Sequence, residues 1–513
     1  MAHDMDRPAG VADHPSFRTG LARPPKPHLR SRGDHPLTDL GNAGRLIELL
    51  GWTLRYDHDR ATWLVWDGVA WRLDEERLIE QFAAEVARGI ELEASEEKDP
   101  DKRSRLLRFA AGSQSYPRIK AMIAVAEPQP DVATRTADFD ADELAINTPS
   151  GLVTLSTEGP AQRPQTPYDL HTRITAARYD AAATCPTWEA FVSQAMLGRP
   201  QLISYLQRAA GYSALGSRRE EVVFFCYGIG GNGKSTFLGM IERALGGYAA
   251  TVNANALLAR AVSAGSLDPD IANLPAVRFL IASEMPENGK LDAAKIKALS
   301  GGDTITVRAL YKQPFSFRPT FQIWIGVNHR PRTDDLTQGF WRRVHLIPWE
   351  LNLSPDQQDH SLKSRLLSEL PGILRWIVDG AVAYLREGLN PPPEVLAATD
   401  SYRAINDPLV AFFSDCCRRD DAAATVEAGK LYAAYTAWCD ATGERPRSQR
   451  SLGVILTERG IQRVLDPQTR RTIYVGVGLL GAERTAAVPG AVEAQPPTDD
   501  LPDLLDDLTD LFG

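Results

Sequence analysis

The sequence predicts an α/β fold for the central part of the chain, and three apolar segments carry that prediction. A short buried strand is expected at VVFFCYG (222–228), which runs into a glycine-rich loop and then into a helix, TFLGMIERAL (236–245). Two more apolar strands are expected at VRFLIASE (277–284) and FQIWIGVN (321–328), and each of them ends in a polar residue. Strands that alternate with helices in this way are typical of α/β domains.

The chain has 513 residues, which is too long for one compact core, and its composition changes along its length. From the N-terminus we expect a disordered tail, a mixed α+β accessory domain, the α/β domain with its leading helices, a helical extension, a winged-helix-like unit and an acidic disordered tail. Their expected ranges are 1–36, 37–185, 186–350, 351–420, 425–480 and 481–513.

Local patterns predict several elements of the accessory domain. Thr38 is a plausible cap for a helix that begins at Asp39, and helices are expected at 75–95 and 101–125. A β-hairpin is expected at 62–73, because apolar residues flank the turn dipeptide Asp67-Gly68. Its three tryptophans fit either the hairpin core or a platform for base stacking.

The overall composition is that of an ordinary soluble protein, with 43% hydrophobic and 24% charged residues. No long apolar span and no signal segment are present, so we expect a cytoplasmic protein with no membrane partner. The five cysteines lack metal-ligand spacing and are expected to be reduced and packed. The net charge of −9 does not exclude binding to nucleic acid, because the charge is unevenly distributed. Residues 481–513 hold eight acidic residues and one basic residue, whereas residues 301–345 hold seven basic and three acidic residues.

The glycine-rich loop matches the pattern GxxxxGK[ST] from Gly228 to Ser235. In this pattern the backbone N–H groups surround phosphate oxygens, Lys234 contacts the β- and γ-phosphates, and the Ser235 hydroxyl coordinates Mg²⁺. The positive end of the following helix faces the same phosphates. We therefore expect ATP and Mg²⁺ as cofactors, bound by Gly228, Gly230, Gly231, Asn232, Gly233, Lys234, Ser235 and Thr236.

The segments after this loop supply candidates for hydrolysis. Glu284 is expected to activate the attacking water or to support Mg²⁺, although a buried strand that merely ends in glutamate has the same pattern. Asn328 is expected to bond the γ-phosphate or the water, and the alternative is an ordinary asparagine in a turn. Arg342 or Arg343 is expected to stabilise transition-state charge at a neighbouring subunit's ATP, and the alternative is an exposed basic pair.

The order of these motifs resembles that of the superfamily 3 helicases, in particular the phage and plasmid primase-helicase branch, which is related to the poxvirus replication ATPase. The resemblance covers most of residues 38–480 and rests on GIGGNGKST (228–236), IASE (281–284), KALSGGDTITVRALYK (297–312), GVNHRPR (326–332) and FWRRVHLIPW (340–349). It implies an AAA+-like P-loop NTPase core, a homo-oligomer in the form of a hexameric ring, and movement along single-stranded DNA in the 3′-to-5′ direction.

The resemblance also implies that segment 297–312 leads into a hairpin facing the channel of the ring. Arg308 and Lys312 are then candidates for contacts with the DNA backbone, Tyr311 for packing on a sugar or base, and Lys297 for the ATP interface. Each of them is alternatively a structural or solvated residue. The expected function is a DNA helicase that acts on forked DNA during replication of a phage, prophage or plasmid, and the alternative is an initiator or loading factor that unwinds little.

The two ends of the chain predict partners. Many members of this branch carry a primase domain ahead of the helicase, whereas this sequence has only about 36 residues there, so we expect a helicase part that works with a separate primase. The tail DDLPDLLDDLTDLFG (499–513) fits an amphipathic helix that docks on such a replication protein, or a plain solvated tail. Arg470 and Arg471, near the turn of the winged-helix-like unit, fit either duplex binding or a protein contact.

Overall fold

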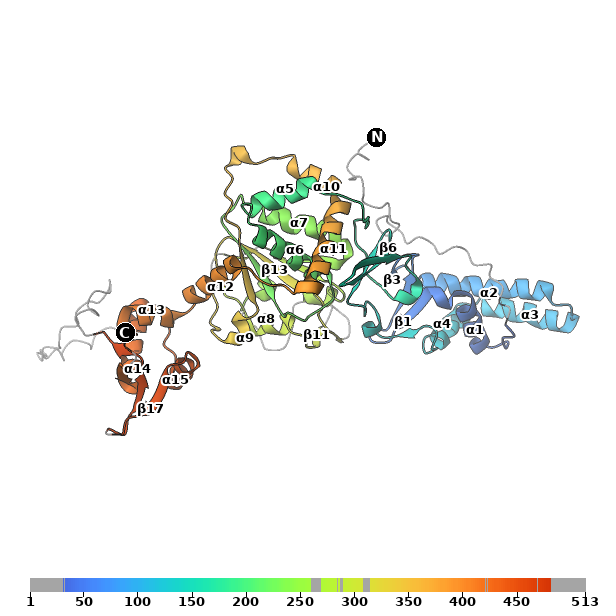
Figure 1. The fold of residues 1–513 in the computed structure, drawn as a ribbon. Coiled ribbons are helices and arrows are strands. Elements are labelled where there is room, and N and C mark those ends of the chain that lie inside the picture. Colours follow the sequence, from blue (N-terminus) through green and yellow to red (C-terminus); the bar gives the residue numbers. More distant parts are fainter. Residues whose placement is uncertain are drawn as a thin grey trace, which may run out of the picture. The chain divides into compact units, whose positions relative to one another are not determined.

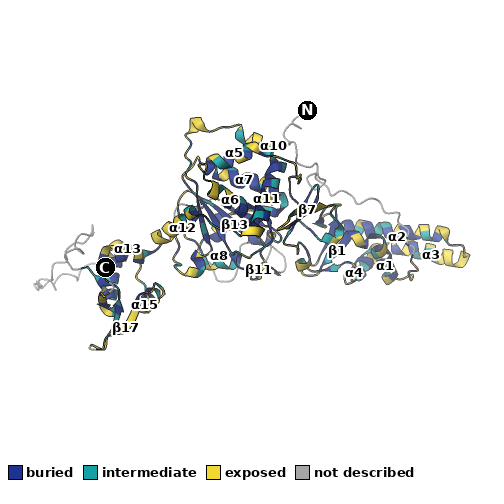
Figure 2. Cartoon of the chain, in the orientation of Figure 1, coloured by how far each residue is buried: buried dark blue, intermediate teal, exposed yellow. Residues whose placement is uncertain are grey.

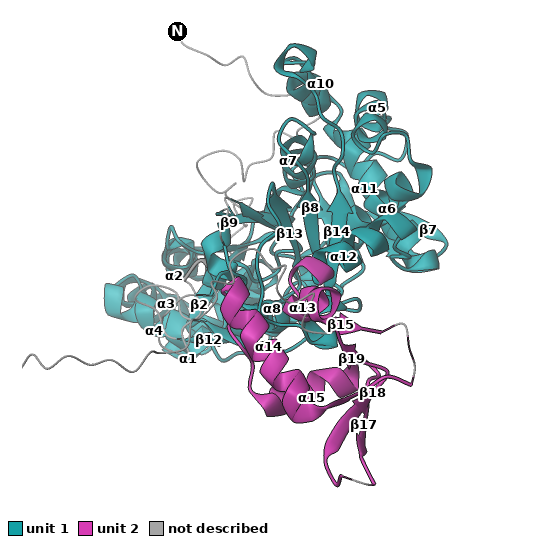
Figure 3. Ribbon diagram, turned by 90° about the vertical axis from the view of Figure 1, so that its left-hand side faces the viewer, with its two compact units in different colours: residues 1–403 teal, residues 404–513 magenta. Residues whose placement is uncertain are grey.

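The computed structural model describes residues 31, 33–259, 269–283, 285–286, 289–307, 314–419, 421, 423–467 and 469–480. The chain divides into two compact units, residues 1–403 and residues 404–513, and each is described by itself (Figures 1 and 3). Among the described residues, no helix has both the length and the apolar character needed to cross a bilayer. The tail expected at 481–513 lies outside the described residues.

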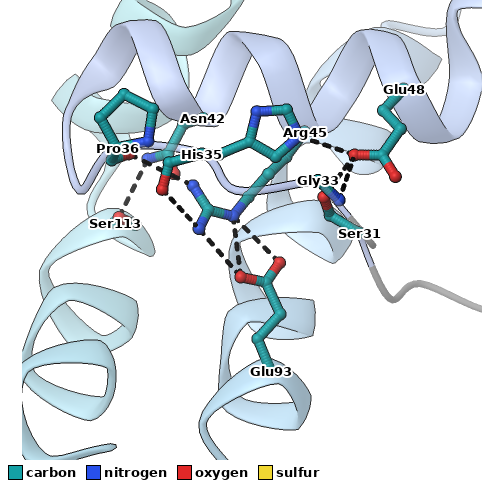
Figure 4. Close-up of polar contacts among 9 residues, drawn as sticks. All are labelled: Ser31, Gly33, His35, Pro36, Asn42, Arg45, Glu48, Glu93 and Ser113. Atoms are coloured by element: carbon teal, nitrogen blue, oxygen red, sulfur yellow. Dashed lines mark hydrogen bonds and ion pairs between the residues drawn. The ribbon is translucent and has the colours of Figure 1, made fainter. Parts of the chain in front are cut away.

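Most of the tail expected at 1–36 lies outside the described residues, but its last residues pack on the first helix, α1 (Asp39–Leu50). The Ser31 hydroxyl and the His35 ring both hydrogen-bond the Glu48 carboxylate, at 2.5 and 2.6 Å (Figure 4). Arg45 is 2% exposed and binds the Glu93 carboxylate through two nitrogens (Figure 4). Residues 33–36 are therefore packed rather than a free tail, and the Thr38 side chain accepts from the Gly41 N–H and caps α1 as expected.

The N-terminal part of unit 1 contains a four-stranded sheet covered by helices. Its strands are β1 (Leu54–Asp57), β2 (Thr62–Trp66), β3 (Trp71–Leu73) and β4 (Ala133–Thr134), in the order β3-β2-β1-β4. The expected hairpin is confirmed, because β2 and β3 pair antiparallel with Trp66 opposite Trp71. All three of its tryptophans are buried, which favours the core over a stacking platform.

Three helices accompany this sheet: α2 (Leu78–Glu96), α3 (Pro100–Ser113) and α4 (Tyr116–Ala126). The single helix expected at 101–125 is wrong, since it is broken into α3 and α4 at Gln114-Ser115. Pro117 explains the break: a proline lacks an N–H group and is tolerated in the first turn of a helix but not in its interior.

A three-stranded antiparallel sheet follows, formed by β5 (Ala145–Thr148), β6 (Gly151–Ser156) and β7 (Gly159–Arg163). Ile146, Val153 and Leu155 from this sheet belong to the main hydrophobic core of unit 1. The accessory region thus does not end at 185 as a separate core, because residues 145–163 pack with the central domain.

The central domain contains a five-stranded parallel sheet. Its strands are β8 (Val223–Tyr227), β9 (Ala249–Asn253), β10 (Phe279–Ser283), β13 (Gln322–Val327) and β14 (Val344–Pro348). Their order is β14-β8-β13-β10-β9, and every neighbouring pair is parallel. The predicted mixed α/β fold is therefore confirmed, with a parallel sheet whose strands are mostly buried (Figure 2).

Helices cover both faces of this sheet. The core on one face includes residues of α5 (Pro186–Ala195), α6 (Pro200–Ala214), α7 (Lys234–Leu245), α10 (Leu362–Ser368) and α11 (Leu370–Glu387). The core on the other face includes residues of α8 (Ala293–Ser300), α9 (Gln338–Trp341) and α12 (Pro393–Ile405), with the antiparallel pair β11 (Ile305–Val307) and β12 (Phe315–Phe317).

Unit 2 has its own core of helices and a small sheet. Its helices are α13 (Pro408–Cys416), α14 (Ala428–Thr442) and α15 (Gln449–Glu458). Its sheet contains β16 (Thr425–Glu427), β17 (Gln462–Leu465) and β18 (Thr472–Val475), in the order β16-β18-β17. β15 (Cys417–Arg418) pairs with β19 (Gly478–Leu479). The expected boundary near 420 moves to 403, because Phe412 of α13 packs its ring 5.4 Å from that of Tyr435. All five cysteines are buried and free.

Candidate functional site

The candidate site lies at the carboxyl edge of the parallel sheet. β8 ends at Tyr227, its neighbour β13 ends at Val327, and β10, next to β13, ends at Ser283. Because parallel strands end at one edge of a sheet, the segments that follow them meet there. Asn328 directly follows β13 and is exposed, and Gly228 donates its N–H to the Val327 carbonyl at 3.2 Å. The fold therefore brings Asn328 close to the start of the glycine-rich loop.

The loop between β8 and α7 has a geometry that only glycine permits at two positions. A Cβ atom on Gly228 would lie 2.1 Å from the Trp349 carbonyl oxygen, a backbone atom that no side-chain rotation can move away. Gly233 has a φ of +87° and directly precedes Lys234, the first residue of α7. The unpaired N–H groups of the first turn of α7 therefore adjoin this loop, which favours negative charge there.

Lys234 is held inside the loop. The residue is only 6% exposed. Its ammonium group donates to the Gly228 carbonyl and, at 3.0 Å, to Oδ1 of Asn232. Burial lowers the pKa of Lys234. These described acceptors are neutral oxygens and leave the ammonium charge unbalanced, so an anion bound at the loop gains a strong interaction.

Asn232 ties the loop to the chain that follows β14. Its side chain is buried, and its Nδ2 donates to the carbonyls of Ile229 and, at 3.2 Å, Trp349. The Leu353 N–H in turn donates to the Gly231 carbonyl at 3.3 Å. Segment 349–353 thus holds the loop in shape from the side opposite to β13.

Ser235 and Thr236 occupy the first turn of α7, where Ser235 is exposed and Thr236 is partly buried. Gly230 and Gly231 are exposed at the tip of the loop. In the part of the chain that the structure describes, His, Cys, Asp and Glu side chains form no group of three that could hold a metal ion. An oxygen ligand such as the Ser235 hydroxyl is the kind that Mg²⁺ accepts.

Four of the expected site residues, Glu284, Arg308, Tyr311 and Lys312, lie outside the described residues. The chain is described up to Ser283 at the end of β10, and Val307 and Phe315 face each other in the pair β11–β12. The expectation for these four side chains therefore rests on the sequence.

Arg342 and Arg343 share one acceptor but have different surroundings. Each guanidinium donates to the Glu221 carboxylate, at 2.5 and 2.6 Å respectively. The side chain of Arg342 is 55% exposed, whereas that of Arg343 is 11% exposed and also donates to the Gly339 carbonyl at 2.5 Å. The structure thus separates two arginines that the sequence leaves equivalent.

Lys297, on α8, binds Asp335 at 2.5 Å and the Thr337 hydroxyl at 3.1 Å. Burial acts to raise the pKa of Asp335, but hydrogen bonds from Lys297 and Thr337 outweigh it and hold that pKa below its usual value. Lys297 is therefore engaged within its own chain near α9, the helix that directly precedes Arg342.

Two buried arginines at the amino edge of the sheet, opposite to the candidate site, were missed by sequence reasoning. Arg278 is 1% exposed, lies 4.6 Å above the Tyr248 ring and donates to the carbonyls of Ala145 and Ala214 at 2.7 and 3.0 Å. Arg218 donates to the carbonyls of Phe321 and Leu299. No local pattern marks either arginine, because their partners are distant in sequence.

Comparisons with known proteins agree with the predicted resemblance in its N-terminal part. A family model described as "D5 N terminal like" matches residues 43–197. A second model, described as a family of unknown function (DUF5906), matches residues 226–343, which include the glycine-rich loop and both arginines.

Curated viral proteins named as candidate helicases are also similar to this chain. Helicase 022R of Frog virus 3 (isolate Goorha) is 28% identical over 268 residues, which are 48% of this chain and 27% of the relative. Helicase L207/L206 of Acanthamoeba polyphaga mimivirus is 26% identical over 254 residues, 46% of this chain and 26% of the relative. The matched part of the chain thus spans about a quarter of each relative. The chain is thus similar, over separate parts of its length, to D5-like N-terminal regions and to viral proteins that are named as helicases.

A solved structure, the apo NrS-1 C-terminal region (305-718), aligns with 82% of this chain and 96% of its own length. Its TM-score is 0.44 and its sequence identity is 9%.

Proposed function

We propose that this chain is an ATP hydrolase with a P-loop, AAA+-like core, and that it works as a DNA helicase. The observation that carries the proposal is the placement of the Lys234 ammonium among neutral oxygens, inside a glycine-rich loop at the N-terminus of α7. A loop of backbone N–H groups, a lysine and a helix N-terminus is the arrangement that binds the phosphates of a nucleoside triphosphate.

In this proposal the residues at the sheet edge divide the work. Lys234 and the loop bind the β- and γ-phosphates, Asn328 positions the attacking water, and Glu284 accepts its proton. Mg²⁺ takes oxygen ligands and keeps several waters, so the exposed Ser235 hydroxyl, with Glu284 as a second candidate, fits it. When bound, the ion neutralises charge on the phosphates. Arg342 reaches the ATP of a neighbouring subunit.

The helicase assignment is supported by the D5-like region and by the viral relatives whose names describe them as helicases. We propose a cytoplasmic hexameric ring that moves 3′-to-5′ on single-stranded DNA at a fork, during replication of a phage, prophage or plasmid. Arg308 and Lys312 would contact the DNA backbone and Tyr311 a sugar or base. A separate primase or another replication protein would bind the acidic tail 499–513.

The test is Lys234→Ala, measured by ATP turnover and by strand displacement on forked DNA. We expect both activities to be lost, because the phosphates lose their main positive charge. The matched control is Lys102→Ala, which removes an exposed lysine on α3 and is expected to leave both activities unchanged. Turnover in Lys234→Ala that equals the wild type would contradict the proposed ATP site.

The alternative is an ATP-dependent initiator or loading factor that assembles on DNA with little unwinding. It predicts that wild-type protein hydrolyses ATP and binds DNA but separates no strands on any fork. That result, together with loss of turnover in Lys234→Ala, would replace the helicase assignment while leaving the ATP site intact.

A further inference from the structure

A cavity of about 590 Å³ lies in unit 1 directly beside the glycine-rich loop. Its walls come from the end of β8 and the start of the loop, from the last residue of β14 and residues 349–352, from Arg199 and Arg330, and from α12. Its volume is in the range of pockets that bind cofactors and small molecules. None of the expected site residues other than Gly228 lines it.

The sheet order gives the cavity a defined relation to the loop. β8 has β13 on one side and β14 on the other. Asn328 and the end of β10 lie on the β13 side, where hydrolysis is proposed, whereas most of the cavity wall comes from the segment at the end of β14 and from α12, with Arg330 reaching it from the β13 side. The cavity adjoins the loop through Gly228 and Ile229, so a nucleotide whose phosphates bind the loop has room there for its nucleoside.

The walls of the cavity supply a flat face and an apolar edge. The Arg330 guanidinium lies 4.7 Å from the centre of the Tyr227 ring, and its Nη1 donates to the Ser401 hydroxyl at 3.3 Å. Ile229, at the tip of the loop, is 76% exposed and lines the cavity together with Ala397 of α12. An exposed isoleucine beside a stacked tyrosine and arginine suits a planar ring with an attached sugar.

Two of the residues that line the cavity each have a polar atom that is buried without a hydrogen-bond partner among the described residues: Nε of Arg330, which is a donor, and Oε2 of Glu394, which is an acceptor. Buried polar groups are nearly always paired, so two such atoms on residues that line one cavity point to a ligand that pairs with them. The ligand must offer an acceptor and a donor. Adenine does so along one edge, through N7 and its amino group, whereas the same edge of guanine presents two acceptors.

We propose that this cavity binds the adenine base and the ribose of the nucleotide whose phosphates the loop binds. Arg330 donates to a ring nitrogen and Glu394 accepts from the amino group. The inference rests on the proposed ATP site, and it adds that the site recognises the base and does so through α12.

The decisive variant is Ala397→Trp, which fills the cavity from an exposed position on α12. Its matched control is Leu396→Trp, the neighbouring exposed residue, which does not line the cavity. Binding of Mg-ATP and of Mg-tripolyphosphate, which has no base, is measured by calorimetry. We expect Ala397→Trp to weaken ATP binding by at least about tenfold and to leave tripolyphosphate binding unchanged. We expect Leu396→Trp to bind both compounds like the wild type.

Each other outcome overturns a defined claim. If Ala397→Trp binds ATP like the wild type, the base does not occupy the cavity. If it loses tripolyphosphate as well, the substitution acts through the phosphate loop and the assignment to the base fails. If wild-type protein binds neither compound, or Lys234→Ala binds both normally, the proposed ATP site itself fails.

A second variant tests recognition of the amino group. Inosine triphosphate replaces that group by a carbonyl, so it presents an acceptor to the Glu394 carboxylate. We expect wild-type protein to prefer ATP over inosine triphosphate by about tenfold or more, and Glu394→Leu to lose that preference. Equal affinity of the wild type for the two nucleotides contradicts the role of Glu394.

Discussion

The contrast between Arg342 and Arg343 leads to a prediction that separates catalysis from folding. Arg343 is nearly buried, donates to Glu221 and Gly339, and its carbonyl accepts from the Val223 N–H at 2.7 Å, at the start of β8. Arg342 is more than half exposed and has Glu221 as its described partner. We therefore expect Arg342 to be the arginine that reaches a neighbouring subunit, and Arg343 to hold the fold.

The structure gives rough magnitudes for the two alanine variants. Arg343→Ala removes two hydrogen bonds of a nearly buried guanidinium, which costs about 1–3 kcal/mol of unfolding free energy. Arg342→Ala removes an exposed ion pair, worth about 0.2–1 kcal/mol. If Arg342 stabilises the transition state in trans, its loss lowers ATP turnover by about 10³-fold or more.

The assay combines denaturant unfolding with ATP turnover. Mixing Arg342→Ala with Lys234→Ala gives a direct control, because each variant supplies the group that the other lacks. In a ring, some interfaces then carry both groups and part of the turnover returns. The reasoning is refuted if Arg343→Ala unfolds like the wild type but has no turnover while Arg342→Ala remains active.

Three further predictions concern stability and the loop. Burial lowers the pKa of His345 to about 4, below its ordinary value of about 6.5. The folded state then binds fewer protons than the unfolded state between about pH 6.5 and pH 4, so the unfolding free energy falls as the pH drops through this range, by about 2 kcal/mol at pH 5. His345→Leu should flatten this part of a stability-versus-pH curve. Arg278→Met removes buried hydrogen bonds to two carbonyls and should lower the unfolding free energy by about 2–5 kcal/mol in denaturant titrations. Asn232→Ala leaves the carbonyls of Ile229 and Trp349 without this donor, and should weaken Mg-ATP binding about tenfold in calorimetry with little change in melting temperature.

The parts of the fold that sequence predicts well are those set by neighbouring residues. The strand at 223–227, the loop and the helix from Lys234 follow from an apolar run and a glycine pattern within about twenty residues. The hairpin at 62–73 follows from a turn dipeptide between apolar residues. In both cases the pattern and the structure that it forms lie in the same short segment.

The parts that sequence does not predict depend on contacts between distant segments. Strand order is one example. β8 lies between β13 and β14, although about a hundred residues separate β8 from each of these strands along the chain. The domain boundaries are another, because residues 145–163 and helix α13 have ordinary patterns and are assigned only by the cores that they join. The cavity beside the loop is a third, since Arg330 and Glu394 are brought together only by the fold.

Arg218 shows how such a contact ties the region expected to contact DNA to the chain that enters β8. It lies five residues before β8 and is 6% exposed, and burial lowers its pKa to about 10, which leaves it charged at neutral pH. Its guanidinium donates to Leu299 at the end of α8, to Gly301 at 3.2 Å, and to Phe321 just before β13. The segment that contains Arg308 and Lys312 therefore starts and ends at carbonyls held by one side chain. Because Arg218 lies in the segment that leads into β8, these hydrogen bonds tie both ends of the expected DNA-contacting segment to the chain that enters the strand before the loop.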